Sequence, residues 1–466
     1  KGDGIHSIKE LVHIENLNEL RGEGHEKPLT KIKIDNQVME ILDKQDLNVE
    51  SIAEKERIVW LRKNANLSTG GIAIDCTGKV HNDNRKIVEI AAKTIGLDIA
   101  GIDMVIPDIS KPISYNYGAI VEVNAAPGIR MHLYPVSGKR RNVASSIIDM
   151  IYPAGSSYTI PLISITGTNG KTTTTRMISN ILQNYGYTVG MTTSHGVYVN
   201  KKCIEAGDTT GPKSAQRVLN NREIDAAVLE TARGGIIRGG LGYNEADVAI
   251  FTNLSKDHLG FDGVDTIEDL LYVKSLVIEA VKENGSSVLN ADDEYIMKII
   301  KYARGKIILF SMNYNNPYVS EHINSGGCAV YMKDGNICLE NNGIAHVITE
   351  VNSIPATING TLKHNIYNSM AAASAAYAIK VPLNIIRESL QNFTTNADCN
   401  PGRFNTYDLG DFKVVLDYGH NLEGYRTTID GLKKLNHTRL IGIIGSPGNR
   451  KDEDIKELGK LSGQSF

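Results

Sequence analysis

The segment ITGTNGKTTTT, residues 165–175, carries small, cationic and hydroxyl side chains in a spacing that suits phosphate binding. It is a shortened form of the usual phosphate loop, G-x-x-x-x-G-K-[ST], because Ile165 stands where the first glycine is expected and Gly167 follows two residues later. Glycines let backbone N–H groups approach phosphates, the lysine supplies positive charge, and the first threonine offers a hydroxyl to Mg²⁺. The sequence therefore predicts an ATP site formed by Gly167, Thr168, Asn169, Gly170, Lys171, Thr172 and Thr173.

A second group of candidate ligands lies near residue 120. Glu122 and Asn124 stand two residues apart in GAIVEVN, so on a strand their side chains share one face. Asp103 lies on the preceding expected strand and joins them if the two strands pair. Two carboxylates and an amide oxygen would form a Mg²⁺ site beside ATP phosphates. The alternative is three polar residues on a solvated sheet face, and spacing alone does not decide between the two.

An alternation of short apolar strands and helices positions the phosphate loop. The loop follows the apolar run PLISIT and precedes a helix that starts near Lys171, which argues against a chance glycine turn. Alternating strands and helices predict an α/β fold with a mostly parallel, doubly wound sheet. The expected strands are 161–166, 225–231, 246–254, 286–292 and 306–311, with a helix over 266–282 and a hairpin over 328–340 that turns at Asp334 and Gly335. The first block is expected to hold a helix over 85–97 and strands over 100–106 and 118–124.

Size and composition limit the class of protein. At 466 residues and 50.9 kDa, the chain is long enough for two or three domains. A net charge of −3 gives no support for nucleic-acid binding, and no apolar run is long enough to span a membrane. Five scattered cysteines without C-x-x-C spacing indicate reduced thiols in a cytoplasm. Both ends cut through domain-like sequence, so we expect an interior piece of a longer protein, with a linker at 152–161.

Six motifs follow the loop: LETARGGI (229–236), TNLSKDHLG (252–260), YVK (272–274), GTLKHNIYN (360–368), NPGRF (400–404) and DYGHN (417–421). In this order they resemble the Mur ligase family of ATP-dependent amino-acid ligases, which includes the folylpolyglutamate synthases. The resemblance implies that Glu230 and Thr172 hold one Mg²⁺ and that His258 helps to hold a second. It also implies that Lys274 is carbamylated, which converts an ammonium into a metal-binding carboxylate. Without the resemblance, Lys274 would be taken for a solvated helix lysine.

The same resemblance assigns residues at the adenine end and in the last α/β unit. Asn365 and Asn368 correspond to adenine-side contacts, although asparagines at a helix start are more often caps. Arg403, Asp417 and His420 lie in the unit that closes over ATP in this family and brings the amino-acid substrate. The spacing alone would make them a loop arginine and a strand-end pair. We expect domains over 1–155, 156–398 and 399–466, the last of them truncated.

The first block is similar to the C-terminal half of an ATP-grasp domain, as in D-alanine–D-alanine ligases and glutathione synthetases. The segments GIDMV and VEVNAAPG carry this likeness, which favours the Mg²⁺ interpretation of Asp103, Glu122 and Asn124. LRKNANLSTGG (61–71) is similar to the glutathione-type branch, where it lies near the phosphates, and implies that Arg62 stabilises charge there. The half with the adenine pocket would precede residue 1, so we expect this chain by itself to be inactive.

An ATP-grasp module followed by a Mur-type module resembles the cyanophycin synthetase family. Both modules transfer the γ-phosphoryl of ATP to a carboxylate, and an amine attacks the acyl phosphate to give an amide. The resemblance implies a polymerase of multi-L-arginyl-poly-L-aspartate, in which the first module adds aspartate to the backbone and the second adds arginine to side-chain carboxylates. The implied partners are ATP, Mg²⁺, aspartate, arginine, the growing polymer and further copies of the protein in a homo-oligomer.

Two other classes of function remain open at this point. One is a different ATP-dependent ligase of the glutathione or folylpolyglutamate type, and the other is a non-catalytic P-loop regulator. The chain also departs from the family near its end, where GNRKD stands in place of the frequent G-D-R-R-D. Asn449 therefore replaces an acidic residue, which leaves the contact at that position, and the choice of amino acid, undetermined.

Overall fold

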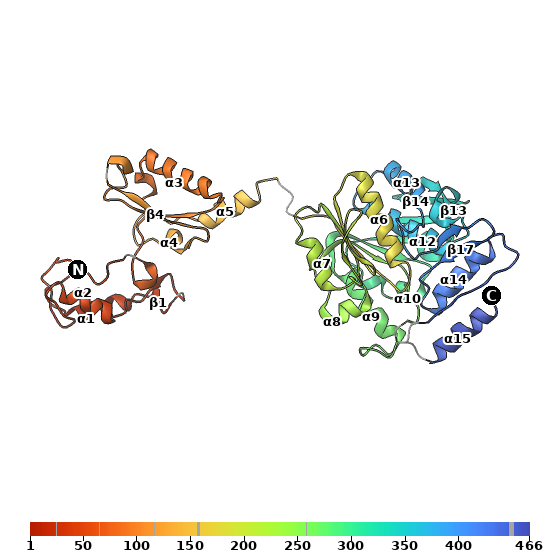
Figure 1. The fold of residues 1–466 in the computed structure, drawn as a ribbon, viewed down its shortest axis with the longest axis horizontal. Coiled ribbons are helices and arrows are strands. Elements are labelled where there is room, and N and C mark those ends of the chain that lie inside the picture. Colours follow the sequence, from red (N-terminus) through yellow and green to blue (C-terminus); the bar gives the residue numbers. More distant parts are fainter. Residues whose placement is uncertain (25, 65, 116, 156–158, 258, 447–451) are drawn as a thin grey trace. The chain divides into compact units, whose positions relative to one another are not determined.

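The computed structural model describes residues 1–24, 26–64, 66–115, 117–155, 159–257, 259–446 and 452–466. The chain divides into two compact units, Lys1–Tyr158 and Thr159–Phe466 (Figure 1). The first unit contains the candidate ligands near residue 120, and the second contains the phosphate loop. No helix in the described ranges is both long enough and apolar enough to cross a membrane.

The first unit combines a small helical part with a helix and a β-hairpin. α1 begins after a capping box in which Ser7 and Glu10 each accept the other's backbone N–H. Ile8 of this helix packs with Val38 and Leu42 of α2 in a small core. The helices are α1 (Ile8–Asn16), α2 (Asn36–Asp43), α3 (Asn82–Ile95), α4 (Arg130–Leu133) and α5 (Val143–Ile151), and the strands are β1 (Arg21–Gly22), β2 (Leu29–Thr30), β3 (Gly101–Val105) and β4 (Ala119–Asn124).

The second unit is built on an eleven-stranded sheet with the order β15-β14-β13-β12-β11-β10-β5-β9-β6-β7-β8. From β13 to β6 in this order, neighbouring strands are parallel, and antiparallel hairpins extend both edges. The strands are β5 (Leu162–Thr166), β6 (Val189–Thr193), β7 (Gly196–Val199), β8 (Lys202–Ala206), β9 (Ala226–Glu230), β10 (Ala246–Phe251), β11 (Val281–Asn290), β12 (Lys306–Ser311), β13 (Cys328–Lys333), β14 (Asn336–Asn341) and β15 (Ile344–Glu350).

Helices cover both faces of this sheet, which confirms the doubly wound prediction. Every residue of β5 and β9 is buried, as expected for parallel strands with helices on each side. Adjacent residues point to opposite faces, so Ile250 packs in one core and Phe251 in the other. The helices are α6 (Lys171–Tyr185), α7 (Pro212–Leu219), α8 (Arg233–Gly239), α9 (Ile267–Glu279), α10 (Glu294–Lys298), α11 (Pro317–Asn324), α12 (Lys363–Ala378) and α13 (Leu383–Gln391).

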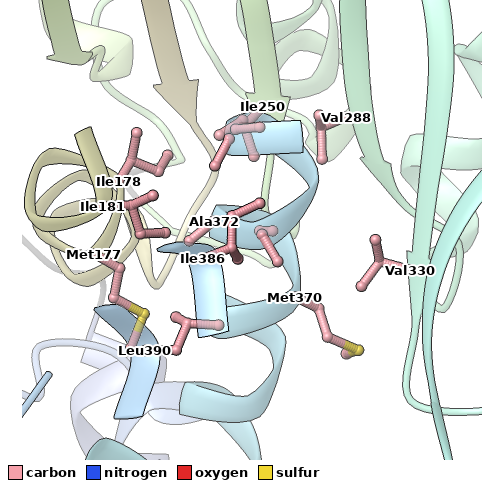
Figure 2. Close-up of a cluster of buried hydrophobic side chains, with 14 of the residues drawn as sticks. Met177, Ile178, Ile181, Ile250, Val288, Val330, Met370, Ala372, Ile386 and Leu390 are labelled. Carbon is pink, nitrogen blue, oxygen red and sulfur yellow. The ribbon is translucent and has the colours of Figure 1, made fainter. Parts of the chain in front are cut away.

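The larger core lies where α6, α12 and α13 pack on one face of the sheet. α12 is rich in alanine and its middle is buried, so its backbone can approach α6 closely. Figure 2 shows Met177, Ile178 and Ile181 of α6 beside Ala372, with Val288 and Val330 of the sheet on the other side of the helix. This packing fixes the start of α6, and with it the phosphate loop, against α12.

Two parts of the second unit differ from the sequence expectations, and a third agrees with them. The helix expected over 266–282 ends at Glu279, because Val281 already pairs with β10 as the start of β11. The strands β6, β7 and β8 were not expected, although Val189–Thr193 is fully buried in the sheet. The hairpin over 328–340 is confirmed, with both turn residues, Asp334 and Gly335, at positive φ.

The last part of the chain contains a small α/β arrangement that lies against the sheet unit. β16 (Asn405–Asp408) and β17 (Lys413–Leu416) pair antiparallel, and α14 (Leu422–Lys433) and α15 (Asp452–Gly463) follow. Asn421 caps α14, since its side chain accepts the Gly424 N–H. Phe404, at the entrance to this part, is fully buried.

Candidate active site

The phosphate loop lies between the buried end of β5 and the first turn of α6. Gly170 precedes the helix at φ +84°, and Gly167 lies at φ +142°, both in backbone conformations that favour glycine. Asn253, in the segment after β10, shapes the loop from outside: its side chain accepts the Asn169 N–H at 2.9 Å and its carbonyl accepts the Thr168 N–H at 2.8 Å. Sequence reasoning assigned no role to Asn253, although it lies in the TNLSKDHLG motif.

The predicted Mg²⁺ ligands meet because β5 and β9 are neighbours in the sheet. Ile165 pairs with Glu230 in register, so the carboxylate lies next to the loop that follows β5. The Thr172 hydroxyl donates to Glu230 at 2.8 Å, and the Ser194 N–H donates to the same carboxylate oxygen at 3.2 Å. Glu230 is only 4% exposed, so it is a desolvated carboxylate with few protein donors, and a bound cation would complete its surroundings.

The donor atoms at this position suit a hard cation. No group of three or more His, Cys, Asp or Glu side chains capable of holding a metal occurs within the described ranges. A carboxylate and a hydroxyl beside a phosphate loop match Mg²⁺, which takes few protein ligands and shares phosphate oxygens and water. The residues present therefore fit Mg²⁺·ATP.

Lys274 is buried, so its interpretation as a solvated helix lysine is wrong. Its side chain extends from α9 to the phosphate loop, where Nζ donates to the Gly167 carbonyl at 2.7 Å. Burial, assisted by the nearby charge of Lys171, holds the pKa of the Lys274 amine well below its ordinary value. Burial thus favours the neutral form of this amine over the ammonium. His258, the predicted companion ligand, lies outside the described residues, as does Asn449.

The two asparagines expected at the adenine end are buried within α12. Asn365 donates to the Ala356 carbonyl at 2.7 Å, and Asn368 donates to Asn365 at 3.1 Å. Asn368 also accepts from the Thr174 hydroxyl of α6. They do not cap α12, because Leu362 holds the cap position. Of the two, Asn368 lines the cavity beside the loop, and Asn365 supports it from behind.

The last α/β part brings its predicted residues to the same loop. Arg403 donates to the Thr172 hydroxyl at 3.3 Å, and its guanidinium lies over the Tyr418 ring at 4.8 Å. Burial lowers the pKa of this guanidinium, an effect that the Glu230 and Asp417 carboxylates oppose. Asp417 accepts the Phe404 N–H at 2.9 Å, which fixes the turn after Arg403.

A reciprocal amide pair joins this part to the phosphate loop. Asn169 donates to Asn421 at 3.2 Å, and Asn421 donates back at 3.0 Å. His420 lies beside Asp257, with Nε2 to Oδ2 at 3.4 Å, so the predicted His420 also contacts the segment that follows β10. Asn421 was missed as a site residue because its partner lies 252 positions away in sequence.

One cavity is lined by most of the predicted side chains of this unit, namely Thr172, Glu230, Asn368, Arg403, Asp417 and His420. Its volume is about 1340 Å³, and its walls come from the phosphate loop, β9, the segments after β10 and β11, α12 and one face of α14. Lys171 lies in this wall and donates to the Thr168 carbonyl at 3.0 Å. His364, another residue that sequence reasoning missed, also lines it; burial lowers the pKa of its imidazole, so the ring is neutral, while Asp417 opposes this shift.

In the first unit, the predicted residues fall into two places. β3 and β4 pair antiparallel, with Asp103 opposite Glu122 and Gly101 opposite Asn124, so the three candidate ligands lie on one hairpin. Both carboxylates are exposed. Like charges directly opposite on a hairpin are unfavourable unless a cation lies between them, which fits Mg²⁺. Arg62 pairs instead with Asp35 at 2.6 Å and donates to Gln37, beside α2.

Comparisons with known proteins agree with this geometry. The family model of the Mur ligase middle domain matches residues 165–376, and that of the Mur ligase glutamate ligase domain matches residues 402–464. The second unit belongs to the Mur ligase family. A ligase from Clostridium botulinum, UDP-N-acetylmuramoyl-L-alanyl-D-glutamate–2,6-diaminopimelate ligase, is 30% identical over 335 residues, which cover 70% of this chain and 64% of that protein.

Over its whole length, this Mur ligase-containing chain is similar to cyanophycin synthetases. It is 43% identical to the cyanophycin synthetase of Synechocystis sp. over 465 residues, which cover 100% of this chain and 53% of that protein. The N-terminal part is similar to the glutathione biosynthesis bifunctional protein of Mannheimia succiniciproducens, with 37% identity over 154 residues that cover 33% of this chain and 20% of that protein. The chain spans about half the length of the curated cyanophycin synthetases that it matches.

Proposed function

We propose that the protein is an ATP-dependent carboxylate–amine ligase of the cyanophycin synthetase type. In this proposal the first unit is the C-terminal part of an ATP-grasp domain that extends a poly-aspartate backbone. The second unit adds arginine to the side-chain carboxylate of each aspartate. The observation that carries the proposal is the 43% identity across the full chain, through both modules in the same order. The convergence of Lys171, Glu230 and Arg403 on one cavity supports it.

The residues of the second unit have complementary roles in this proposal. The loop N–H groups and Lys171 bind the phosphates of ATP, and Asn368 lies toward the adenine. Thr172 and Glu230 hold Mg²⁺, which when bound neutralises charge on the transferring phosphoryl group. Arg403 supplies positive charge from the C-terminal domain, so that the site is complete only when this domain lies on the loop. The remaining catalytic effect is the alignment of the amine with the acyl phosphate.

Lys274 and His258 would form the second metal site. A neutral Lys274 amine can add CO₂, with loss of one proton, to give a carbamate whose oxygens suit Mg²⁺. Its burial beside Gly167 and the lowered pKa of its amine support this modification. In the first unit, Asp103, Glu122 and Asn124 would hold Mg²⁺ for the other ATP, and Arg62, which pairs with Asp35, would stabilise charge on its phosphates.

We further propose domains over 1–155, 156–398 and 399–466, with the linker at 152–161. The five free cysteines support a reducing compartment such as the cytoplasm. A homo-oligomer remains part of the proposal.

Phosphate release from the whole protein tests the assignment. Purified enzyme with ATP, Mg²⁺, a short aspartate polymer and arginine should release phosphate, and arginine should enter the polymer. Matched reactions contain glycine with γ-glutamylcysteine, or glutamate with a folate, in place of arginine and the polymer. Phosphate release only in these matched reactions would replace the proposal with a glutathione- or folylpolyglutamate-type ligase. ATP binding without turnover on any amine would instead indicate a P-loop regulator.

A further inference from the structure

A second cavity, of about 380 Å³, opens beside the phosphate loop in the Mur ligase unit. The two cavities meet beside Lys171, since both are lined by Thr168, Lys171, Asp208, Thr210, Ala232 and His420. Its other walls come from Gly167, from α8 and α9, which include Arg238 and Lys274, and from the segment around Asp257. The volume lies in the range of small-molecule sites. A group bound here would lie beside Lys171 of the phosphate loop.

The acidic side chains of this second cavity already have partners. Asp262 pairs with Arg233 at 2.8 Å, and Asp208 accepts from the Thr210 hydroxyl at 2.7 Å. Asp257 contacts His420 at 3.4 Å. Arg238 differs from them, since its exposed guanidinium makes no hydrogen bond or ion pair with any part of the chain that the structure describes. The cavity therefore presents one uncommitted guanidinium close to Lys171, which favours an anionic ligand.

Gly234 leaves the space that this guanidinium occupies. It lies one turn before Arg238 on α8, and a Cβ built there would come 2.9 Å from Nη2 and 3.4 Å from Cζ of Arg238. Side chains on a helix tilt toward its N-terminus, which in α8 is the end that follows Glu230 and the sheet. The glycine thus allows Arg238 to fold back toward the cavity, and any side chain at 234 would displace its guanidinium.

The proposed chemistry supplies a ligand with two anionic groups. When a backbone carboxylate is activated and the amine of aspartate attacks it, the new terminal residue carries a free α-carboxylate and a free side-chain carboxylate. We propose that the second cavity binds the α-carboxylate of this terminal aspartyl residue through Arg238, while the side-chain carboxylate lies at Lys171 for phosphorylation. This inference rests on the proposed function. A guanidinium fork matches a carboxylate with two parallel hydrogen bonds, so Arg238 determines specificity for the free chain end.

Two acceptors that differ only in the α-carboxylate test this assignment in the whole enzyme. One is a short aspartate polymer with a free C-terminus, and the other is the same polymer with a C-terminal carboxamide. Wild-type enzyme should show a KM for the free acid about ten- to hundredfold below that for the amide, as expected for a lost charge-assisted pair. Arg238→Ala should raise the KM for the free acid to that for the amide and leave kcat almost unchanged.

Three further variants separate a specific contact from a structural effect. Arg238→Lys keeps the charge but loses the fork, so its KM should be intermediate. Gly234→Ala keeps the arginine but moves it, and should behave like Arg238→Ala. Arg222→Ala removes an exposed arginine outside both cavities and should match wild type.

The outcomes separate this inference from the proposed function. If Arg238→Ala impairs both acceptors equally, or if wild type does not distinguish them, the role of Arg238 is wrong while arginine addition stands. If wild-type enzyme adds no arginine to either acceptor, the proposed function fails, and this inference fails with it.

Discussion

The candidate metal site on the hairpin and the one at Glu230 are built in different ways. In the first unit, Asp103 and Glu122 lie opposite each other on an exposed hairpin. In the second unit, Glu230 is buried at the end of a central strand and accepts from Thr172 of α6 and from the Ser194 N–H after β6. The hairpin carboxylates retain their solvation, whereas Glu230 has lost it and depends on fixed partners. A site assembled from several elements is preorganised but sensitive to each of them, and the hairpin site depends mainly on charge.

The largest effect is expected from a substitution that disables the ATP site of the second unit and leaves the ATP site of the first unit intact. Lys171→Ala in the whole enzyme should reduce arginine addition about a hundred- to thousandfold, because a preorganised cation at the phosphates is lost. Aspartate addition should remain, since it uses the ATP-grasp site. Incorporation of each labelled amino acid, measured separately, distinguishes the two reactions. Loss of both would contradict two independent ATP sites.

The second test removes a negative charge from the candidate metal site on the hairpin of the first unit. Glu122→Gln should raise the Mg²⁺ concentration needed for aspartate addition about tenfold, equivalent to ~1.4 kcal/mol of metal affinity. Initial rates of aspartate incorporation across a Mg²⁺ titration measure this. Glu89→Gln, which removes the charge of another exposed carboxyl in the first unit, on α3 rather than on the hairpin, is the matched control. An unchanged Mg²⁺ dependence for Glu122→Gln would exclude its metal role.

A third test concerns the burial of Lys274. Its pKa is lowered in the folded state, so the unfolded chain binds a proton that the native chain does not. Stability should therefore rise with pH toward the ordinary lysine value of 10.5, with a slope of up to ~1.4 kcal/mol per pH unit. Lys274→Met should remove this slope, and the exposed Lys306→Met should keep it.

Hydrogen exchange of the β5 amides in urea measures the stability of the second unit alone. The measurement is made between pH 7 and 9 in bicarbonate-free buffer. If the unfolding free energy rises with pH by the same slope in wild type and in Lys274→Met, Lys274 is protonated in the folded protein. The basis for its carbamylation would then be lost.

The smallest expected effect concerns the bridge between Asn169 and Asn421. Asn421→Ala removes both this bridge and the cap of α14, and should cost about 1 kcal/mol in local stability. Asn421→Ser keeps a cap but is too short for the amide pair. Both variants should slow arginine addition about fivefold, equivalent to one lost hydrogen-bonded pair. Wild-type kcat in Asn421→Ser would mean that Asn421 acts only as a cap.

The same contrast explains which parts of the site could be predicted from the sequence and which could not. The loop over 167–173 and the strand before it were predictable, because glycine spacing and an apolar run are local signals. The position of Glu230 followed from its place at a strand end. The support given by Asn253 and the Asn169–Asn421 pair depend on segments brought together by the fold. The burial of Lys274 also has no local signal, since a lysine on a helix is ordinarily solvated.

The phosphate yield of the whole enzyme tests the central claim most directly. Polymerisation with labelled aspartate and arginine should release one phosphate for each aspartate and one for each arginine incorporated, because each module activates its own carboxylate. Lys171→Ala should retain only the phosphate linked to aspartate. Fewer phosphates than residues incorporated, or a Lys171→Ala enzyme that still adds arginine, would contradict two ligase sites that share one chemistry.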